Sequence, residues 1–473
     1  MERARLDERR DGRLGEEVMQ STSQLVFVVC AISSAAAVRP ARADVVTDWN
    51  ENTQQAIATA VTAPAATARV FAIVHAAVFD AVNGIHGRYA PYHVDFEPPR
   101  GGVSRSAAAV QAAYATLIKL FPTQKPTLDA KRDASLALLV DDGEPGEDGD
   151  ENDTEGSDAI ARGISWGQAV ADDILAWRST DGFSTTFPPY VGGTAPGQWR
   201  PTPPDFRTAV FQQVATMVPF AMPSASWARP PGPPALASAQ YARDFNEVKA
   251  LGRRTNSTRT PEQTQIALFW DDNGGVQWNR VAVSVAALHH NTLTENARLL
   301  AMFNIALADA GIAAWDGKYH YSSWRPVTAI PLGDTDGNPA TQADPEWLPL
   351  RALTPPHQEY PSAHSTNSAA AAAVLGAFFG DDVIFSATSV PLSGVVRTWT
   401  RFSDAAAEVN DARVYFGIHF RSAVVDGRAA GEMVANYVTT HIAQPARRQP
   451  GKTNHDHGHA EIAAAGEISG DGE

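Results

Sequence analysis

Cationic and imidazole side chains, which can bind an anion and move protons, recur in three separated segments of this sequence. In the first segment, WDGKYHYSSWRPVTAI, the residues Lys318, Ser322 and Arg325 are spaced i, i+4 and i+7. If the segment is helical, these side chains lie on one face, and Pro326 ends the helix. Aromatic residues crowd the two charges, which favours a walled site; the alternative is an exposed lysine and arginine on an amphipathic helix.

The second segment, LTPPHQEYPSAHSTNSAAAAA, places Ser362 and His364 at the start of an alanine-rich helix predicted over 365–379. The unpaired N–H groups and the positive dipole end of a helix start attract anions. Ser362 taken alone would be an ordinary N-cap. His364 is a titratable group at the same place, which suits a proton donor or acceptor.

The third segment, DARVYFGIHFRSAVVDGRAAG, contains Arg413 and His419. Six residues separate them by about 120° around an unbroken helix, so their side chains converge only if the chain bends. Gly417 lies between them and is a plausible break.

The three segments together bring three cations, two histidines and a hydroxyl into a protein whose formal net charge is -15. This acidic balance argues against general affinity for nucleic acid or anionic membranes. If the cations converge and are buried, they must surround a multiply charged oxyanion. Phosphate and vanadate fit, because both are tetrahedral and both can become trigonal bipyramidal with an imidazole as apical group.

The spacing of these residues resembles the three-part signature of the vanadium-dependent haloperoxidases and the related type 2 phosphatidic acid phosphatases. The parts are K-x6-RP from Lys318, PSxH from Pro361 and R-x5-H from Arg413. The segments VHAAVFDAVNGIHGRYAPY and PGQWRPTPP also resemble the haloperoxidase-like branch. The resemblance covers mainly 260–440 and extends over most of the chain, and it implies an all-α, haloperoxidase-like fold.

The resemblance also implies roles for individual residues. His419 would be the apical imidazole, a vanadium ligand in a haloperoxidase or the nucleophile in a phosphatase, and His364 would be the acid–base group. Trp315 would line the pocket. His357 matches a halide-selectivity position and suggests bromide or iodide over chloride, or else it is a polar residue at the pocket rim. The positions that would bind the equatorial oxygens are Lys318, Arg325, Ser362, Arg413 and the backbone N–H of Ala363.

Two residues depart from the family pattern. Ala363 replaces the usual glycine of PSGH, keeps the N–H, and resists a positive φ. Ala423 stands where the family often has an aspartate that follows the apical histidine. A group that orients His419 must then come from elsewhere, and Asp426 or a backbone carbonyl are the candidates.

Three functions follow from these residues. The first is a haloperoxidase that uses vanadate and hydrogen peroxide to oxidise a halide in the presence of a small organic acceptor, with His364 and Lys318 polarising the peroxide. The second is an acid phosphatase that hydrolyses a phosphomonoester through a phosphohistidine at His419. The third is a decayed, non-enzymatic oxyanion-binding protein, for which Ala363 and Ala423 are the reason. Oligomerisation is compatible with each of them.

The elements that must position these residues are predicted to be helices. Alanine-rich segments with helical spacing recur along the chain, and the longest, 293–321, opens with a capping-box pattern at Thr292 and Glu295. No segment alternates with period two for long enough to predict a sheet. The sequence therefore predicts an all-α fold of one or two helical bundles. A proline-rich connector at 187–206 is predicted to be irregular and to border the pocket.

The chain is expected to divide into five parts. Residues 1–43 resemble a signal peptide, with an arginine-rich start and an apolar run that contains the only cysteine, Cys30. We therefore expect export, to a periplasm or outside the cell, and no stable membrane insertion. The mature chain would comprise an N-terminal helical half and a catalytic helical bundle, with an acidic insertion and a disordered tail. The predicted ranges are 44–258 and 259–444 for the two halves, 141–158 for the insertion and 445–473 for the tail.

Overall fold

The computed structural model describes residues 44–141 and 156–446. The predicted signal peptide, nearly all of the acidic insertion and nearly all of the tail lie outside these residues, so they and the expected export stay predictions. The described chain is mostly helical, with a single two-stranded sheet in this part. The all-α prediction is confirmed.

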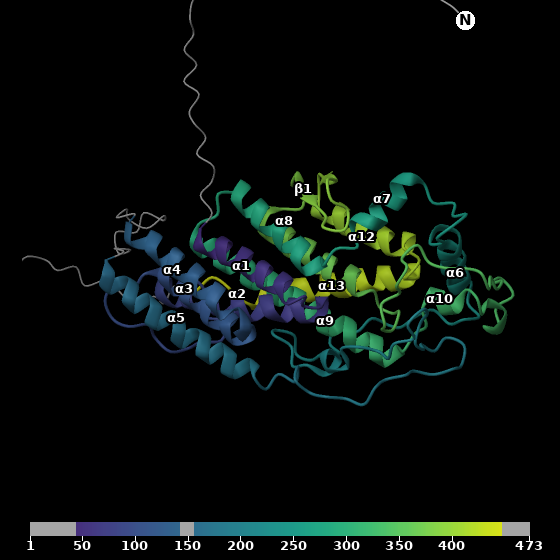
Figure 1. Cartoon of the computed structure of the whole chain (residues 1–473), viewed down its shortest axis with the longest axis horizontal. Helices are drawn as coiled ribbons and strands as arrows, with labels where there is room; N and C mark the ends of the chain where they lie inside the picture. The colour runs from purple at the N-terminus through teal and green to yellow at the C-terminus, as the bar shows by residue number, and fades with distance from the viewer. Residues whose placement is uncertain (1–43, 142–155, 447–473) are drawn as a thin grey trace, which may run out of the picture. The chain divides into compact units, whose positions relative to one another are not determined.

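In Figure 1 the helices before residue 180 lie at one end of the ribbon, and the helices after residue 400 run toward the other end. The first five are α1 Val45–Thr59, α2 Pro64–His86, α3 Arg105–Leu120, α4 Lys125–Asp141 and α5 Ser157–Arg178. The next are α6 Ala239–Leu251, α7 Pro261–Phe269, α8 Gly274–Leu288, α9 Leu293–Tyr321 and the short α10 Pro326–Ala329. The last are α11 Ala363–Phe379, α12 Phe402–Tyr415 and α13 Arg421–His441.

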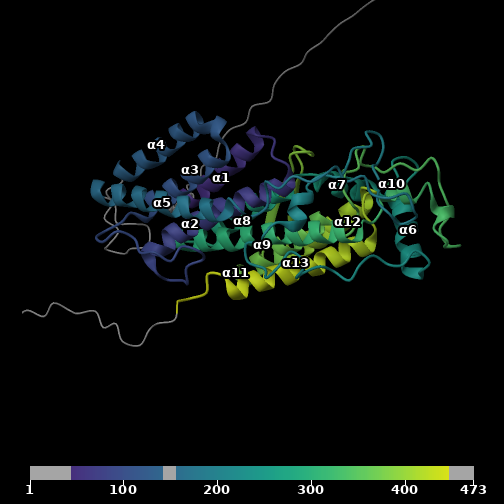
Figure 2. The same ribbon diagram turned by 90° about the horizontal axis from the view of Figure 1, so that it is seen from below.

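Helix α9 is the central element, and it packs against α2, α11 and α13 (Figure 2). Its predicted capping box is present: the Thr292 hydroxyl accepts from the N–H of Glu295, and the Glu295 carboxylate accepts from the N–H of Thr292. Nearly every side chain of α9 is buried, as expected of a helix surrounded by others. One hydrophobic cluster contains side chains from both predicted halves of the mature chain. The boundary at residue 258 stays a prediction.

The expectation that Lys318, Ser322 and Arg325 share one helical face is wrong. Helix α9 ends at Tyr321, and Ser322 follows in a left-handed conformation with φ 48°. Its hydroxyl lies 2.6 Å from the hydroxyl of Tyr190. Arg325 comes after this turn, as the N-cap residue of α10. The tight turn at Ser322 therefore places Arg325 near Lys318.

Two glycines of α13 set the distance between α13 and α11. A Cβ atom at Gly431 would lie 2.0 Å from the carbonyl oxygen of Thr366, and one at Gly427 would lie 2.9 Å from that of Ser362. These contacts are closer than van der Waals packing allows, so only glycine permits this approach. The N-terminus of α11 is thereby held against the start of α13, where the N–H of Ser362 donates to the carbonyl of Ala423.

The chain turns between α12 and α13, as predicted from Gly417. This glycine has φ 74°, and a Cβ there would lie 2.5 Å from the carbonyl oxygen of Gly252. The turn separates Arg413, in the last turn of α12, from His419, just before α13. The bend that convergence requires is present.

The prediction that no sheet forms overlooked one short hairpin. Strands β1 Phe385–Thr388 and β2 Val396–Trp399 pair antiparallel. Four residues are too few for an alternating pattern to stand out in the sequence. The proline-rich connector 187–206 forms no helix, as predicted.

Two helices, Pro64–His86 and Leu293–Tyr321, are long and apolar enough to cross a membrane by length and composition. Most of each is buried inside the protein: 83% of the most apolar window of the first and 89% of the second. The core helix of a globular protein has the same composition, so the two helices are weak evidence for a span.

Candidate functional site

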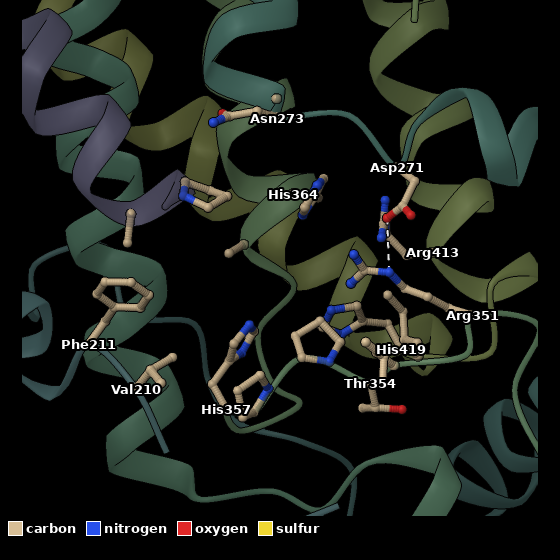
Figure 3. A pocket seen from close by; sticks show the side chains of 18 of the residues that line it. Val210, Phe211, Asp271, Asn273, Arg351, Thr354, His357, His364, Arg413 and His419 are labelled. Atoms are coloured by element: carbon tan, nitrogen blue, oxygen red, sulfur yellow. Dashed lines mark ion pairs between the residues drawn. The ribbon is translucent and has the colours of Figure 1, made fainter. Parts of the chain in front are cut away.

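The three predicted segments meet at one cavity of about 480 Å³. The end of α9, the loop that precedes α11, the start of α11 and the turn after α12 all reach it. Figure 3 shows His364, Arg413, Arg351 and His419 on one side and Val210 and Phe211 on the opposite side. The predicted site residues that line the cavity are Trp315, His357, Ala363, His364, Arg413 and His419.

Three fully buried cations, Lys318, Arg325 and Arg413, lie at this site. Lys318 does not line the cavity. Its Nζ donates to the backbone carbonyls of Gln358, Glu359 and Pro361 at 2.9, 3.1 and 2.6 Å. These bonds fix the loop that carries His357 to the start of α11. Burial and the charge of Arg325 hold the pKa of Lys318 well below its usual value.

Arg325 also bonds to the protein, and it bridges two of the histidines. Its Nε donates to the carbonyl of His357 at 2.9 Å, and its Nη1 donates to the carbonyl of Ile418 at 2.8 Å. Nη1 lies 3.1 Å from Nε2 of His419, and Nη2 lies 3.0 Å from Nδ1 of His357. Because a guanidinium only donates, both ring nitrogens act as acceptors here.

Arg413 differs from the other two cations because most of its donors have no acceptor. Nη1 donates to the carbonyl of Trp270 at 2.6 Å. Among the described residues, Nε and Nη2 are buried without a hydrogen-bond partner. Burial lowers the pKa of Arg413 to about 9, which still leaves the group charged at neutral pH. A buried guanidinium with two unmatched donors is the strongest indication that this site binds an anion.

His419 is oriented by a carboxylate that the sequence reading missed. Its Nδ1 lies 2.9 Å from Oε1 of Glu359, and the same oxygen accepts from the N–H of Phe420 at 2.9 Å. Burial raises the pKa of Glu359 to about 7 against the opposing charge of Arg325. Burial and nearby cations hold the pKa of His419 well below its usual value, so the ring is neutral and Nδ1 carries the proton.

The start of α11 places His364 and Ser362 differently. His364 lines the cavity, with Nε2 3.4 Å from the carbonyl oxygen of Asp272. Burial and the charge of Arg413 hold its pKa well below the usual value. Ser362 is fully buried behind the helix start, where its Oγ accepts from the N–H of Ser365 at 3.3 Å and bonds its hydroxyl at 2.9 Å. In this structure Ser362 acts as the N-cap.

Aromatic side chains form the opposite wall of the cavity. The rings of Trp315 and Phe211 are stacked, with centroids 6.1 Å apart. The ring of His357 meets Trp315 edge-on, at 4.6 Å between centroids. Residues of the predicted connector, including Thr202 and Pro203, also line the cavity. The connector therefore borders the pocket, as expected.

The chain is similar in sequence and in fold to known proteins. Residues 298–448 match the family model described as the VCPO second helical-bundle domain. Vanadium chloroperoxidase from Curvularia inaequalis is 31% identical over an alignment that covers 28% of this chain and 27% of that protein. The crystal structure described as the first bacterial vanadium-dependent iodoperoxidase superposes with a TM-score of 0.72 at 26% identity, covering 85% of this chain and 97% of that one.

Residues 298–448 therefore belong to the vanadium haloperoxidase superfamily, and most of the chain shares the fold of a bacterial vanadium-dependent iodoperoxidase. A bacterial vanadium-dependent chloroperoxidase in its holo form has the same fold as the present chain, with a TM-score of 0.64 at 18% identity. The superposition covers 86% of the present chain and 99% of the chloroperoxidase chain.

Two expectations about this superfamily member are corrected by the structure. Asp426 does not orient His419; its carboxylate accepts from the hydroxyl of Tyr360 at 2.7 Å. Ala363 needs no positive φ, because it is the first residue of α11 and its backbone is helical. The methyl group of Ala363 therefore causes no backbone strain.

Three charged residues at the site were not predicted. Glu359 is the only carboxylate between Glu346 and Asp381. Because this segment already contains several site residues, the position of Glu359 could have identified it as a site residue too. Arg351 and Asp271 had no such signal. They form an ion pair at the cavity, with 2.9 Å between Nε and Oδ1.

The residues present fit an oxyanion. Within the described ranges, no group of three His, Cys, Asp or Glu side chains is placed to hold a metal cation. Buried cations surround a neutral imidazole instead, and Glu359 is the fully buried carboxylate among them. Vanadate, which the superfamily implies, has the negative charge that these cations require.

Proposed function

We propose that this protein is a vanadate-dependent haloperoxidase that oxidises a halide with hydrogen peroxide, with a small organic molecule as the acceptor. The observation that carries the proposal is the fully buried Arg413, whose Nε and Nη2 have no acceptor among the described residues. An oxyanion supplies both the acceptors and the compensating charge.

The residues that would hold vanadate are Arg413, Arg325, the N–H groups at the start of α11, and His419. Bound there, vanadate would supply the Lewis-acidic centre that activates hydrogen peroxide toward the halide. Lys318 and Ser362 are proposed as further ligands, although their polar atoms bond to the protein here. Lys318 contributes its charge from behind the loop in either case.

His419 is proposed as the residue that would ligate vanadium, because of its tautomer. Glu359 accepts the proton of Nδ1, which leaves the lone pair of Nε2 toward Arg325 and the cavity. A carboxylate behind the ring also raises the basicity of Nε2 and fixes the plane of the ring. Glu359 therefore takes the role of the aspartate that Ala423 replaces.

His364 is proposed as the proton donor and acceptor. It lines the cavity beside Arg413, and its ring is neutral in the absence of an anion. An anion in the cavity would counter the charge of Arg413 and move the pKa of His364 upward, toward the range where proton transfer is efficient.

Bromide or iodide is proposed as the preferred halide. His357 lines the cavity and contacts both Trp315 and Arg325. The structural relative at 26% identity is described as an iodoperoxidase, which supports the same preference.

The test is a vanadate titration of the purified protein in phosphate-free buffer. We expect peroxide-dependent oxidation of bromide and iodide to rise with orthovanadate to a plateau, and phosphate to compete with it. His419→Ala should abolish the activity. His441→Ala, at the exposed end of α13, is the matched control and should retain it.

Two other results would contradict the proposal. Hydrolysis of an aryl phosphate that vanadate inhibits, without halide oxidation, would make the protein a phosphatase that uses His419 as nucleophile. Vanadate binding with neither activity would support the decayed, non-enzymatic oxyanion-binding protein. Halide oxidation that chloride supports as well as bromide would remove only the halide preference.

A further inference from the structure

The cavity has two chemically different sides, and the oxyanion site accounts for only one of them. Arg351, Arg413, His364 and His419 face it from one side, and the ring of Phe211 lies across from them (Figure 3). The ring of Trp315, which also lines the cavity, is stacked on that of Phe211. A halide ion needs neither an aromatic wall nor a volume of about 480 Å³. Cavities of a few hundred Å³ with apolar walls and a few polar groups are typical of sites for small organic molecules.

Arg351 is one of two arginines that line this cavity outside the oxyanion site, and the other is Arg207. Its backbone is fixed, because its N–H donates to the carbonyl of Phe416 at 3.2 Å. Its Nε pairs with Asp271, and within the described residues the structure gives Nη1 and Nη2 no acceptor. The side chain is 29% exposed, so it is reachable by a ligand from solvent. The outer edge of a guanidinium binds carboxylate oxygens in the plane of the group.

Phe211 is held in place by an unusual backbone conformation. It has φ 61° and ψ 35°, a left-handed conformation that bulky residues rarely adopt. The N–H of the preceding residue, Val210, donates to the carbonyl of Pro356 at 3.1 Å, which fixes the connector beside the loop that leads to α11. Such outliers gather where the position of a side chain matters for binding. Here the outlier places the Phe211 ring against Trp315.

We propose that this cavity binds an aromatic acceptor that carries an anionic oxygen, with the ring against Phe211 and Trp315 and the anionic group on Arg351. This inference rests on the proposed haloperoxidase function and names its organic substrate class. In the reaction, halide, hydrogen peroxide, one proton and the aromatic C–H give a carbon–halogen bond and two water molecules. The halide loses two electrons and the peroxide gains them, and the proton displaced from the ring ends in the second water molecule.

The experiment measures binding of a matched pair of probes to the vanadate-loaded protein by calorimetry, without peroxide. The probes are 4-hydroxybenzoate and its uncharged analogue 4-hydroxybenzamide. We expect the carboxylate to bind about ten-fold more tightly, as a hydrogen bond between charged groups predicts. Arg351→Met should remove this difference, and Arg351→Lys should restore part of it. Phe211→Ala should weaken both probes equally.

Arg207→Met is the matched control, because Arg207 also lines the cavity but is exposed on the connector. It should leave the ratio of the two affinities unchanged. Equal affinity of wild type for both probes, or a ratio that depends on Arg207 and not on Arg351, would overturn the inference. Vanadate binding to each variant must first be shown by calorimetry to saturate, so that loss of the cofactor is not mistaken for loss of the acceptor site.

A second measurement separates this inference from the proposed function. Bromination of a mixture of the two probes should favour the carboxylate and should saturate with its concentration. If bromide is oxidised but the product ratio equals that given by free hypobromite, the acceptor site is wrong and the haloperoxidase proposal stands. If the probes bind as expected and no halide is oxidised, the haloperoxidase proposal is wrong and the binding site stands.

Discussion

Two of the buried clusters of polar side chains in the described part of this protein differ in net charge. The first joins Asn50 of α1, His75 of α2, Asn279 of α8 and Asn304 of α9. Asn50 bonds Nε2 of His75 and the oxygen of Asn279, and the side chains of Asn279 and Asn304 bond each other. The second is the cation cluster at the cavity, where Arg413 has two donors without acceptors.

The difference separates a structural cluster from a binding cluster. The asparagine network is uncharged and its amides satisfy one another, so it fixes how four helices pack. The cation cluster carries charge that the protein does not neutralise, which lowers stability unless an anion arrives. Burial alone does not distinguish the two clusters. Net charge does, because the uncharged network also has a buried atom without a partner, Nδ1 of His75.

The largest expected effect comes from replacing the cation with unmatched donors. Arg413→Met should reduce halide oxidation by about 10²- to 10³-fold, the effect of removing a donor from an oxyanion site. The same variant should unfold at a higher temperature than vanadate-free wild type, because a buried unpaired charge is gone. Activity assays and thermal unfolding check both parts. A variant that loses stability would contradict the comparison.

The opposite pattern is expected in the asparagine network. Asn279→Leu should destabilise the protein by about 2 to 4 kcal/mol, because Asn50 and Asn304 both lose a partner in a buried site. Its affinity for vanadate should be unchanged, since α8 contributes no residue to the cation cluster. Denaturant unfolding and the vanadate titration measure the two quantities. Reduced vanadate affinity in a folded variant would show that the two clusters are coupled.

An oxyanion should stabilise only the cation cluster. Vanadate at about one hundred times its dissociation constant should stabilise wild type by about 2.7 kcal/mol, and phosphate should act in the same direction. Arg413→Met should lose most of this gain, and Asn279→Leu should keep it. Thermal unfolding at several vanadate concentrations provides the measurement. An equal gain in Arg413→Met would mean that the anion binds elsewhere.

The asparagine network should also make the protein sensitive to acid. Burial lowers the pKa of His75 to about 3, against an ordinary value of 6.5 in the unfolded chain. The unfolded chain therefore takes up a proton that the folded chain refuses. The stability from His75 is complete above pH 6.5 and falls toward pH 3 by about 1.4 kcal/mol per pH unit.

The variant His75→Gln tests this, because glutamine can still accept from Asn50 but does not titrate in this range. Between pH 6 and 4 its free energy of unfolding should fall less steeply than that of wild type. Denaturant titrations at each pH give the two slopes, and the difference between them isolates His75 from the carboxylates that also titrate. Equal slopes would mean that His75 is not buried as a neutral ring.

The sequence by itself determined the all-α class, the length of α9 with its capping box, the start of α11 and the break at Gly417. Each depends on interactions within a few residues: a cap, an apolar period, a left-handed glycine. The motif residues Lys318, Arg325, His364, Arg413 and His419 were likewise readable as types at fixed spacing. What they bind was then inferable from their charge.

Only the tertiary structure decided which groups meet. Contacts between segments far apart in the chain place Glu359 behind His419 and Arg351 beside Asp271. Such contacts also give the donors of Lys318 and Arg325 their backbone carbonyl acceptors. The turn at Ser322 and the glycine contacts of α13 set those distances. Short-range preferences fix the elements, but the partner of a buried charge is chosen by the packing of several elements at once.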